Sequence, residues 1–176
     1  MPAPSRTRPL KPHDHIADVL AVEPNSRGLC FVVFDEDGKL LDWGGFEART
    51  QKNAACRRRV RMLTLSYQPK HIVLEDGDAL GSTRRRRIRE LLRALFQDAG
   101  DSGCIVVRIA RARVREQFYA FKIGSKDDLA RAVCSLYPEL APRLPRRRCT
   151  WESEHYSLAL FEAAALGVTF LDQLKR

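Results

Sequence analysis

Two acidic residues end apolar runs of the sequence, at places where an ionised side chain is costly to bury. Glu23 ends the run that begins at Val19, and Glu75 ends the run that begins at His71. A buried carboxylate without a partner is strongly unfavourable, so each would need a cation beside it. Two carboxylates held together repel each other, and a divalent cation removes that repulsion; hard oxygen ligands favour Mg²⁺ or Mn²⁺. We therefore expect Glu23 and Glu75 to be metal ligands, although either acid alone could face solvent or cap a turn.

A third acid is expected from the last helix of the chain. Glu162 borders a stripe of small residues, Ala159, Ala163 and Gly167, which recur at every fourth position. Such a stripe lets a helix approach a sheet closely. Glu162 would then face the edge of the sheet and complete the acidic set begun by the two strand-end glutamates.

Other acids and one histidine compete for the same role. Asp76 stands beside Glu75, and Glu154 and His155 precede the last apolar stretch. Glu154 is the second choice for the third acid, but acids such as Glu152 and Glu154 also stabilise the first turn of a helix by facing its dipole. A lone histidine near a helix start is more often neither a ligand nor a base, so His155 is a weaker candidate.

The charge of the chain indicates a nucleic-acid partner. Lys and Arg number 31 against 22 Asp and Glu, a net charge of +9, and 24 of the cations are Arg. Arg pairs with phosphate in a bidentate way that Lys does not, and clustered Arg is typical of nucleic-acid-binding surfaces. The alternative is a solubilising surface. The residues expected to contact nucleic acid are Arg58, Arg84, Arg85, Arg86, Arg87, Arg146 and Arg147.

Alternating apolar and turn-forming segments predict the elements that would position these residues. Three strands come first, joined by short connections that favour an antiparallel meander. The chain then alternates strand and helix, and Pro138, Pro142 and Pro145 break it before the last helix. The expected strands cover residues 19–23, 29–34, 39–44, 71–75 and 104–109. The expected helices cover residues 50–66, 84–99, 111–121, 126–136 and 154–173.

These elements predict an α/β fold with a mixed five-stranded sheet, three antiparallel strands followed by two parallel ones, and helices on both faces. Right-handed crossovers would place the fourth strand beside the first and the fifth beside the fourth. Glu23 and Glu75 would then stand at the carboxyl ends of adjacent parallel strands. Sites in α/β sheets tend to lie at such an edge.

The remaining features concern organisation and compartment. Residues 1–15 carry four prolines and no apolar period, so we expect a flexible basic tail before a single domain at 16–176. The N-terminus lacks the apolar segment of a secretory signal, and no apolar run is long enough to span a bilayer. Five cysteines without a C-x-x-C pair favour a reducing compartment over a disulfide framework or a zinc site. We expect a cytoplasmic protein without a membrane partner.

Three segments, taken in order, resemble a known family. VLAVEPNSRGLCFVVFDEDGKLLDWGGF resembles the opening hairpins of the RuvC-like Holliday-junction resolvases, members of the RNase H-like superfamily. HIVLED resembles their fourth strand with its glutamate, and FEAAALGV resembles their closing helix. The pattern runs over most of residues 19–170. The resemblance implies an RNase H-like fold, and DNA rather than RNA as the partner.

The resemblance also implies an activity, a metal-dependent endonuclease acting on structured nucleic acid. Glu23, Glu75 and Glu162 match the family's catalytic, metal-binding acids, and two Mg²⁺ ions would activate a water and stabilise the leaving oxygen of a phosphodiester. Arg84 to Arg87 would lie at the rim of the site and grip backbone phosphates. Because a junction is cut symmetrically by a two-fold assembly, a homodimer is implied, with the helix at 50–66 as a candidate surface.

Two departures from the family pattern keep alternatives open. The family usually has Asp where this chain has Glu23 and Glu162, and its fourth acid would fall at Ala159, which cannot bind a metal. An extra methylene moves a carboxylate by more than an ångström, a displacement large enough to slow catalysis greatly. The alternatives are a catalytically impaired nucleic-acid-binding module on the same fold and a nuclease that processes RNA.

Overall fold

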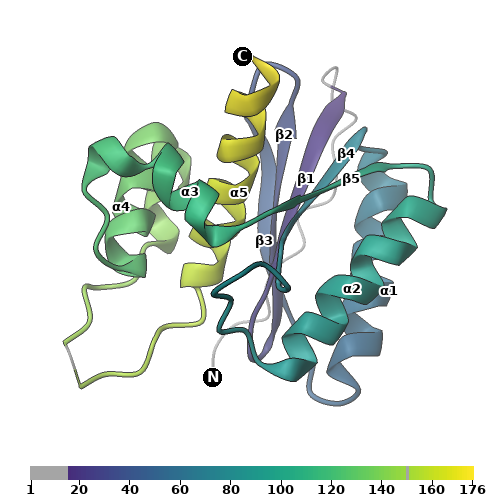
Figure 1. Cartoon of the computed structure of the whole chain (residues 1–176), viewed down its shortest axis with the longest axis horizontal. Coiled ribbons are helices and arrows are strands. Elements are labelled where there is room, and N and C mark those ends of the chain that lie inside the picture. Colours follow the sequence, from purple (N-terminus) through teal and green to yellow (C-terminus); the bar gives the residue numbers. More distant parts are fainter. Residues whose placement is uncertain (1–15, 150) are drawn as a thin grey trace.

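A mixed five-stranded sheet forms the centre of the computed structural model, which describes residues 16–149 and 151–176 (Figure 1). Across the sheet the order is β3-β2-β1-β4-β5. β1 pairs antiparallel with β2, and β2 with β3, whereas β4 runs parallel to both β1 and β5. The strands are β1 (Ala17–Pro24), β2 (Gly28–Asp35), β3 (Leu40–Glu47), β4 (His71–Glu75) and β5 (Ile105–Ile109). This confirms the predicted sheet; the tail predicted at 1–15 lies outside the described residues.

Helices cover both faces of the sheet, as the sequence predicts (Figure 1). One face carries α1 (Lys52–Tyr67) and α2 (Arg86–Asp101). The other carries α3 (Arg111–Gln117), α4 (Lys126–Leu136) and α5 (Leu158–Leu174), with two short 3₁₀ helices, η1 (Tyr119–Phe121) and η2 (Pro138–Arg143).

The strand β1 shows why the sheet is buried on both faces. All eight of its residues are buried. Val19 and Ala21 pack into the core beneath α5, whereas Leu20 and Val22 pack into the core beneath α1 and α2. Because successive side chains of a strand point to opposite faces, a continuous apolar run supplies both cores at once.

Helix α5 packs against the sheet through a face that includes small residues. Ala159, Ala163 and Gly167 are buried. A Cβ atom on Gly167 would lie only 2.3 Å from Cε2 of Phe34 in β2, so no side chain fits there. The small-residue stripe therefore has the role that the sequence predicts for it: Gly167 lets α5 pack directly on β2.

Most boundaries shift by one to three residues from the sequence prediction, and three segments differ more clearly. The last helix begins at Leu158 rather than at 154, because the preceding residues bond locally: Nδ1 of His155 lies 2.6 Å from Oγ of Ser157. The helix predicted at 111–121 ends at Gln117 and continues as η1. The proline loop contains η2, in which Pro138 presets the first helical position and the buried Leu140 anchors the turn.

Two further findings concern the wider properties of the chain. In the part that the structure describes, none of the helices is long and apolar enough to cross a membrane. All five cysteines are free thiols, with Cys30 and Cys56 buried.

Candidate functional site

Glu23 and Glu75 lie side by side where β1 and β4 end. The two strands pair in parallel up to Val22 and Leu74, so the acids that follow occupy neighbouring positions at the same edge. Both are buried, with only 1% of Glu23 and 3% of Glu75 exposed. Two carboxylates this deeply buried and this close require positive charge between them.

That charge is the guanidinium of Arg84. Its Nη2 contacts Glu23 Oε1 and Glu75 Oε2, and its Nε donates a 2.7 Å hydrogen bond to Glu75 Oε2. The side chain of Arg84 is only 14% exposed. A single guanidinium thus bridges the two strand-end acids that the sequence assigns to a metal.

The loop between β4 and α2 explains how Arg84 reaches this place. Asp76 Oδ1 accepts from the backbone N–H of Asp78 at 3.1 Å, which turns the chain directly after the strand. Gly77 then passes so close to α2 that a Cβ atom would lie 2.8 Å from Leu92 Cδ1. The loop therefore folds back over the sheet edge, and its last residues return Arg84 to the acids.

Glu162 joins the same cluster through a second guanidinium. Arg111 Nε lies 3.0 Å from Glu75 Oε1, and its Nη2 donates to Glu162 Oε1 at 2.9 Å. Lys126 Nζ lies 3.1 Å from Glu162 Oε1 and also contacts Glu154. Acids and bases alternate along this series, which we call the carboxylate–cation chain: Glu23, Arg84, Glu75, Arg111, Glu162, Lys126 and Glu154.

Burial dominates the ionisation of the central members. It raises the pKa of Glu75 from 4.5 to about 7; nearby Arg111 opposes the rise and Glu162 adds to it. Burial and repulsion from Arg111 lower the pKa of Arg84 to about 10, still well above neutral pH. The guanidinium therefore stays charged between the two acids.

These residues do not fit a Mg²⁺ or Mn²⁺ site. Arg84 occupies the space between the carboxylates that a bridging metal ion would need, and Arg111 and Lys126 engage the third acid. Within residues 16–149 and 151–176, no three His, Cys, Asp or Glu side chains are arranged to hold a metal ion. The expected acids are brought together, but around cations supplied by the protein itself.

The weaker ligand candidates lie at or beyond the margin of this cluster. Asp76 accepts a hydrogen bond within its own turn, and His155 pairs with Ser157 and stacks on Tyr156. Glu154 contacts Lys126 at the end of the chain of charges. Because α5 begins only at Leu158, Glu154 lies in the preceding loop and does not stabilise the first turn of that helix.

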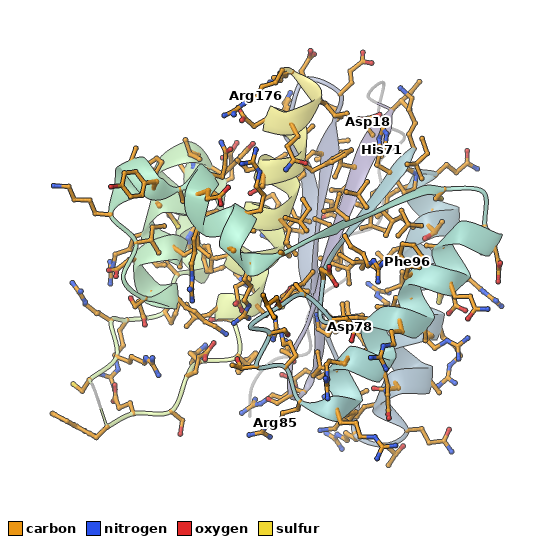
Figure 2. The ribbon with its side chains drawn as sticks, viewed as in Figure 1. Asp18, His71, Asp78, Arg85, Phe96 and Arg176 are labelled. Atoms are coloured by element: carbon orange, nitrogen blue, oxygen red, sulfur yellow. The ribbon has the colours of Figure 1, made fainter. Side chains whose placement is uncertain are left out.

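The predicted nucleic-acid-binding arginines separate into exposed and engaged ones. Arg85, Arg86 and Arg58 are exposed, as are Arg146 and Arg147, which pair with Glu152 and Asp128 respectively. Arg84 is engaged by the two buried acids. Arg87 donates to Asn53 Oδ1 and to the backbone oxygen of Asn25, both at 3.0 Å, so it fastens α2 to the start of α1 and to the turn between β1 and β2. Figure 2 shows Arg85 near the lower end of the molecule, far from Asp18.

Two members of the site, Arg111 and Lys126, are absent from the residues that sequence reasoning selects. Arg111 follows the end of β5 by two residues, so the rule that directs attention to the carboxyl ends of parallel strands applies to it as well. Lys126 directly follows Ser125, whose side chain caps α4 by accepting from the Asp128 N–H. Its position depends on the packing of α4 against α5, for which the sequence carries no signal.

The cluster opens into a pocket of about 440 Å³ between α3, α4 and α5. Glu23, Glu75 and Glu162 line it together with Arg111, Arg115 and Lys126. Four aliphatic side chains, Val114, Ile123, Leu129 and Leu166, line it as well. The pocket therefore has both charged and apolar walls.

Comparison with solved structures identifies the fold. The chain is similar to Thermus thermophilus RuvC, with a TM-score of 0.63 and 16% identity over 89% of this chain and 96% of that one. It is also similar to the yeast mitochondrial Holliday junction resolvase Ydc2 (TM-score 0.58, 13% identity, 94% and 83% covered). A third match is the Fowlpox virus resolvase, solved with Holliday junction DNA (TM-score 0.51, 15% identity, 88% and 99% covered). Neither a protein-family model nor a curated protein sequence matches the chain.

Proposed function

Given that this chain has the RuvC-like form of the RNase H-like fold, we propose that it binds structured DNA without metal-dependent cleavage. The observation that carries the proposal is the Arg84 guanidinium between Glu23 and Glu75. It supplies the positive charge that the buried acids need, so these acids can be held together without a metal.

Binding is supported by charge and by the exposed arginines. The net charge of +9 draws the chain toward a polyanion, and the exposed Arg85 and Arg58 can reach phosphate oxygens from the surface. Arg86 is exposed as well, and its Nε donates to Glu90 Oε1 at 2.7 Å. T. thermophilus RuvC and the Fowlpox virus resolvase have both been solved with Holliday junctions. A four-way junction is therefore the first DNA structure to test.

The lack of turnover follows from what the acids already contact. Two-metal hydrolysis requires carboxylates that are free to ligate. Here each of Glu23, Glu75 and Glu162 contacts at least one Arg or Lys of the protein, and position 159 is an alanine on the buried face of α5. A metal would have to displace a buried guanidinium before it could reach the first two acids.

A metal-dependent endonuclease using Mg²⁺ or Mn²⁺ is the second candidate, and one observation favours it. Glu23, Glu75 and Glu162 converge on one pocket at the carboxyl edge of a fold that resolvases share. This candidate requires Arg84 to swing out of the cluster when the substrate and metal arrive. It applies to an RNA substrate as well as to DNA.

A cleavage and binding panel decides between the two. The substrates are a labelled four-way junction, duplex DNA, single-stranded DNA and RNA, each with Mg²⁺, Mn²⁺ or EDTA. We expect binding that is strongest for the junction, is unchanged by EDTA, and weakens steeply with salt, with no cutting. Metal-dependent cutting by the wild-type chain that the E75Q variant loses would overturn the proposal and establish the second candidate.

Matched arginine variants test the binding surface in the same assay. R85Q and R86Q should each weaken binding about equally for all DNA substrates and reduce the slope of log K against log salt by about 1. R176Q at the far end of the chain serves as the control. An affinity that does not depend on salt would contradict binding through phosphate contacts.

Self-association is a separate part of the proposal. Met62 and Leu65 of α1 are exposed, which supports the homodimer surface predicted on this helix. Sedimentation of the wild type and of the M62E/L65E variant tests it, with a monomeric wild type as the contradicting result.

A further inference from the structure

The two helical layers that cover the sheet differ in charge. Helices α1 and α2, on one face, carry nine Lys and Arg against three Asp and Glu. On the other face, α3, α4 and α5 carry five of each. The excess positive charge of the helices therefore lies in the α1–α2 layer, which does not line the pocket. Charge of one sign gathered on one face attracts a partner of the opposite sign to that face.

Part of this charge forms a line along α2. Arg85 directly precedes the helix, and Arg89 and Arg93 follow it at every fourth position, a spacing that puts side chains on one helix face. Phe96 continues this face, and the guanidinium of Arg108 in β5 lies 4.6 Å from the centre of the Phe96 ring. Figure 2 shows Arg85 at the lower end of the molecule and Phe96 further up beside α2. The four exposed arginines, which we call the arginine stripe, are Arg85, Arg89, Arg93 and Arg108.

One carboxylate, that of Asp78, lies among three members of the stripe. Arg93 donates to it through Nε at 2.8 Å and through Nη2 at 2.6 Å. These hydrogen bonds hold the pKa of Asp78 below its ordinary value, and the charges of Arg89 and Arg108 act in the same direction. The three guanidinium groups are therefore close enough for their charges to add at one place.

Most of the positive charge of the stripe is not neutralised by the protein. Asp78 pairs with Arg93, and Glu90, the next acid along the chain, accepts from Arg86 at 2.7 Å. Among the residues that the structure describes, no acid forms an ion pair with the other three members of the stripe. The pocket differs in this respect, because its glutamates already pair with its cations. Unpaired like charges at a surface favour an anionic partner.

The length of the stripe decides between a small anion and a polymer. From Arg85 to Phe96 the helix rises by about 16 Å, at about 1.5 Å per residue. A single phosphate spans only a small part of that distance, whereas each strand of a duplex presents a phosphate about every 3.4 Å along the helix axis. A nucleic-acid backbone therefore fits the stripe better than a free nucleotide does.

The contact between Arg108 and Phe96 decides between a duplex and a single strand. Proteins that bind single strands stack the bases on aromatic rings. Phe96 is the aromatic residue on this face, and Arg108 lies over its ring where a base would otherwise stack. The stripe thus presents guanidinium groups for phosphates, which a duplex carries on its outside while its bases are paired within.

We propose that the arginine stripe binds the phosphates of one strand of a duplex arm, along the outer face of α2. Guanidinium groups bind phosphate oxygens through charge-assisted, bidentate hydrogen bonds. The inference rests on the proposed function and specifies the face and the form of DNA that the chain holds. The competing occupant, a second copy related by a two-fold axis, would bring its own positive stripe against this one.

Fluorescence anisotropy with the full chain tests the stripe on three labelled probes: the four-way junction, a linear duplex and a single strand of the same sequence. R89Q and R108Q should each weaken junction and duplex binding about tenfold and reduce the slope of log K against log salt by about 1. R131Q is the matched control, because Arg131 is also exposed but lies on α4 in the other helical layer. It removes the same charge and should leave both affinities nearly unchanged.

A variant of the opposite sign separates charge from structure. D78N removes a negative charge from among the stripe and keeps the shape of the side chain, so binding of the duplex should strengthen about threefold. Weaker binding by D78N would mean that the ion pair with Arg93 matters for structure rather than for charge, and would contradict the inference. Circular dichroism melting confirms that each variant is folded.

The outcomes separate this inference from the proposed function. Salt-dependent junction binding that R89Q and R108Q reduce no more than R131Q does would overturn the stripe alone. No binding of any nucleic acid would overturn both. Tighter binding of the single strand than of the duplex, lost in R89Q and R108Q, would overturn the choice of a duplex. A wild-type dimer that R89Q and R108Q dissociate in sedimentation would assign the stripe to a second copy.

Discussion

The β1–β4 pair buries acids at both of its ends, and different kinds of cation neutralise them at each end. At the carboxyl end, Glu23 and Glu75 are joined by Arg84 within a series of seven charged residues. At the amino end, Asp18 has Lys70 at 3.4 Å and His71 at 3.5 Å. Lys70 directly precedes β4, and His71 is the first residue of that strand. Figure 2 shows Asp18 and His71 together at that end.

The two ends differ in the segment that supplies the cation and in how exposed that cation is to solvent. Lys70 is largely exposed, so its charge is hydrated whether or not Asp18 is present. Arg84 is buried, so its charge depends on the two acids, and theirs on it. An acid at a strand end thus indicates a need for positive charge, and only its surroundings decide whether a metal or a side chain meets that need.

The sharpest way to break this comparison is to remove Arg84. The R84M variant leaves Glu23 and Glu75 buried together without a cation between them, so we expect a loss of about 3–5 kcal/mol in the free energy of unfolding. Urea denaturation measures it. R85M, one residue along the same arginine run but exposed, should change stability by less than about 0.5 kcal/mol. Equal losses in the two variants would contradict the bridging role.

The second prediction asks whether a metal can replace the guanidinium. With the carboxylates of R84M uncovered, Mn²⁺ at about 100 times its dissociation constant should restore about 2.7 kcal/mol of stability. Thermal melting with Mn²⁺ or EDTA measures this, and the wild type should show no difference between the two. An equal Mn²⁺ shift in the wild type would mean that Arg84 does not close the site.

The third prediction concerns pH at the carboxyl end. Because the pKa of Glu75 rises from 4.5 to about 7 on folding, the folded chain holds a proton between these values that the unfolded chain has released. The contribution of Glu75 to stability therefore decreases as pH rises from about 4.5 to about 7, on the order of 1 kcal/mol for each unit of pKa shift. E75Q should lack this component. If the free energy of unfolding of the wild type and of E75Q changed with pH in parallel, the prediction would be contradicted.

The smallest effect is expected at the amino end. D18N leaves Lys70 hydrated and creates no isolated buried charge, so we expect a loss of about 1 kcal/mol or less. Urea denaturation of D18N and R84M under the same conditions compares the loss of unfolding free energy at the two ends of these strands. A loss as large as that of R84M would remove the distinction between the two ends.

Much of the fold could be predicted because local sequence patterns determine its strands and helices. The apolar runs and short connections predict the sheet order, and α2 buries the predicted stripe of Ile88, Leu91, Leu92, Leu95 and Ala99. The convergence of Glu23 and Glu75 follows from that order. The start of α5 was misplaced because Ser, His and Glu suit a first turn of helix as well as they suit a loop.

The cations of the site could not be predicted in the same way. Arg84 belongs to a run of four arginines whose members look alike in sequence, and the fold of the loop before it decides that this one points inward while Arg85 does not. Lys126 depends on how α4 packs against α5. Tertiary packing decides which cations enter the site, and it produces no periodic pattern in the sequence.

The absence of a side chain at Gly167 affects the site as well as the packing of α5. Any Cβ atom there would collide with Phe34 and push α5 outward, carrying Glu162 away from Arg111 and Lys126. In a saturation mutational scan scored on stability, position 167 should therefore tolerate as few amino acids as the charged positions do, although it has no functional group of its own. A residue that does no chemistry would be read by such a scan as part of the site.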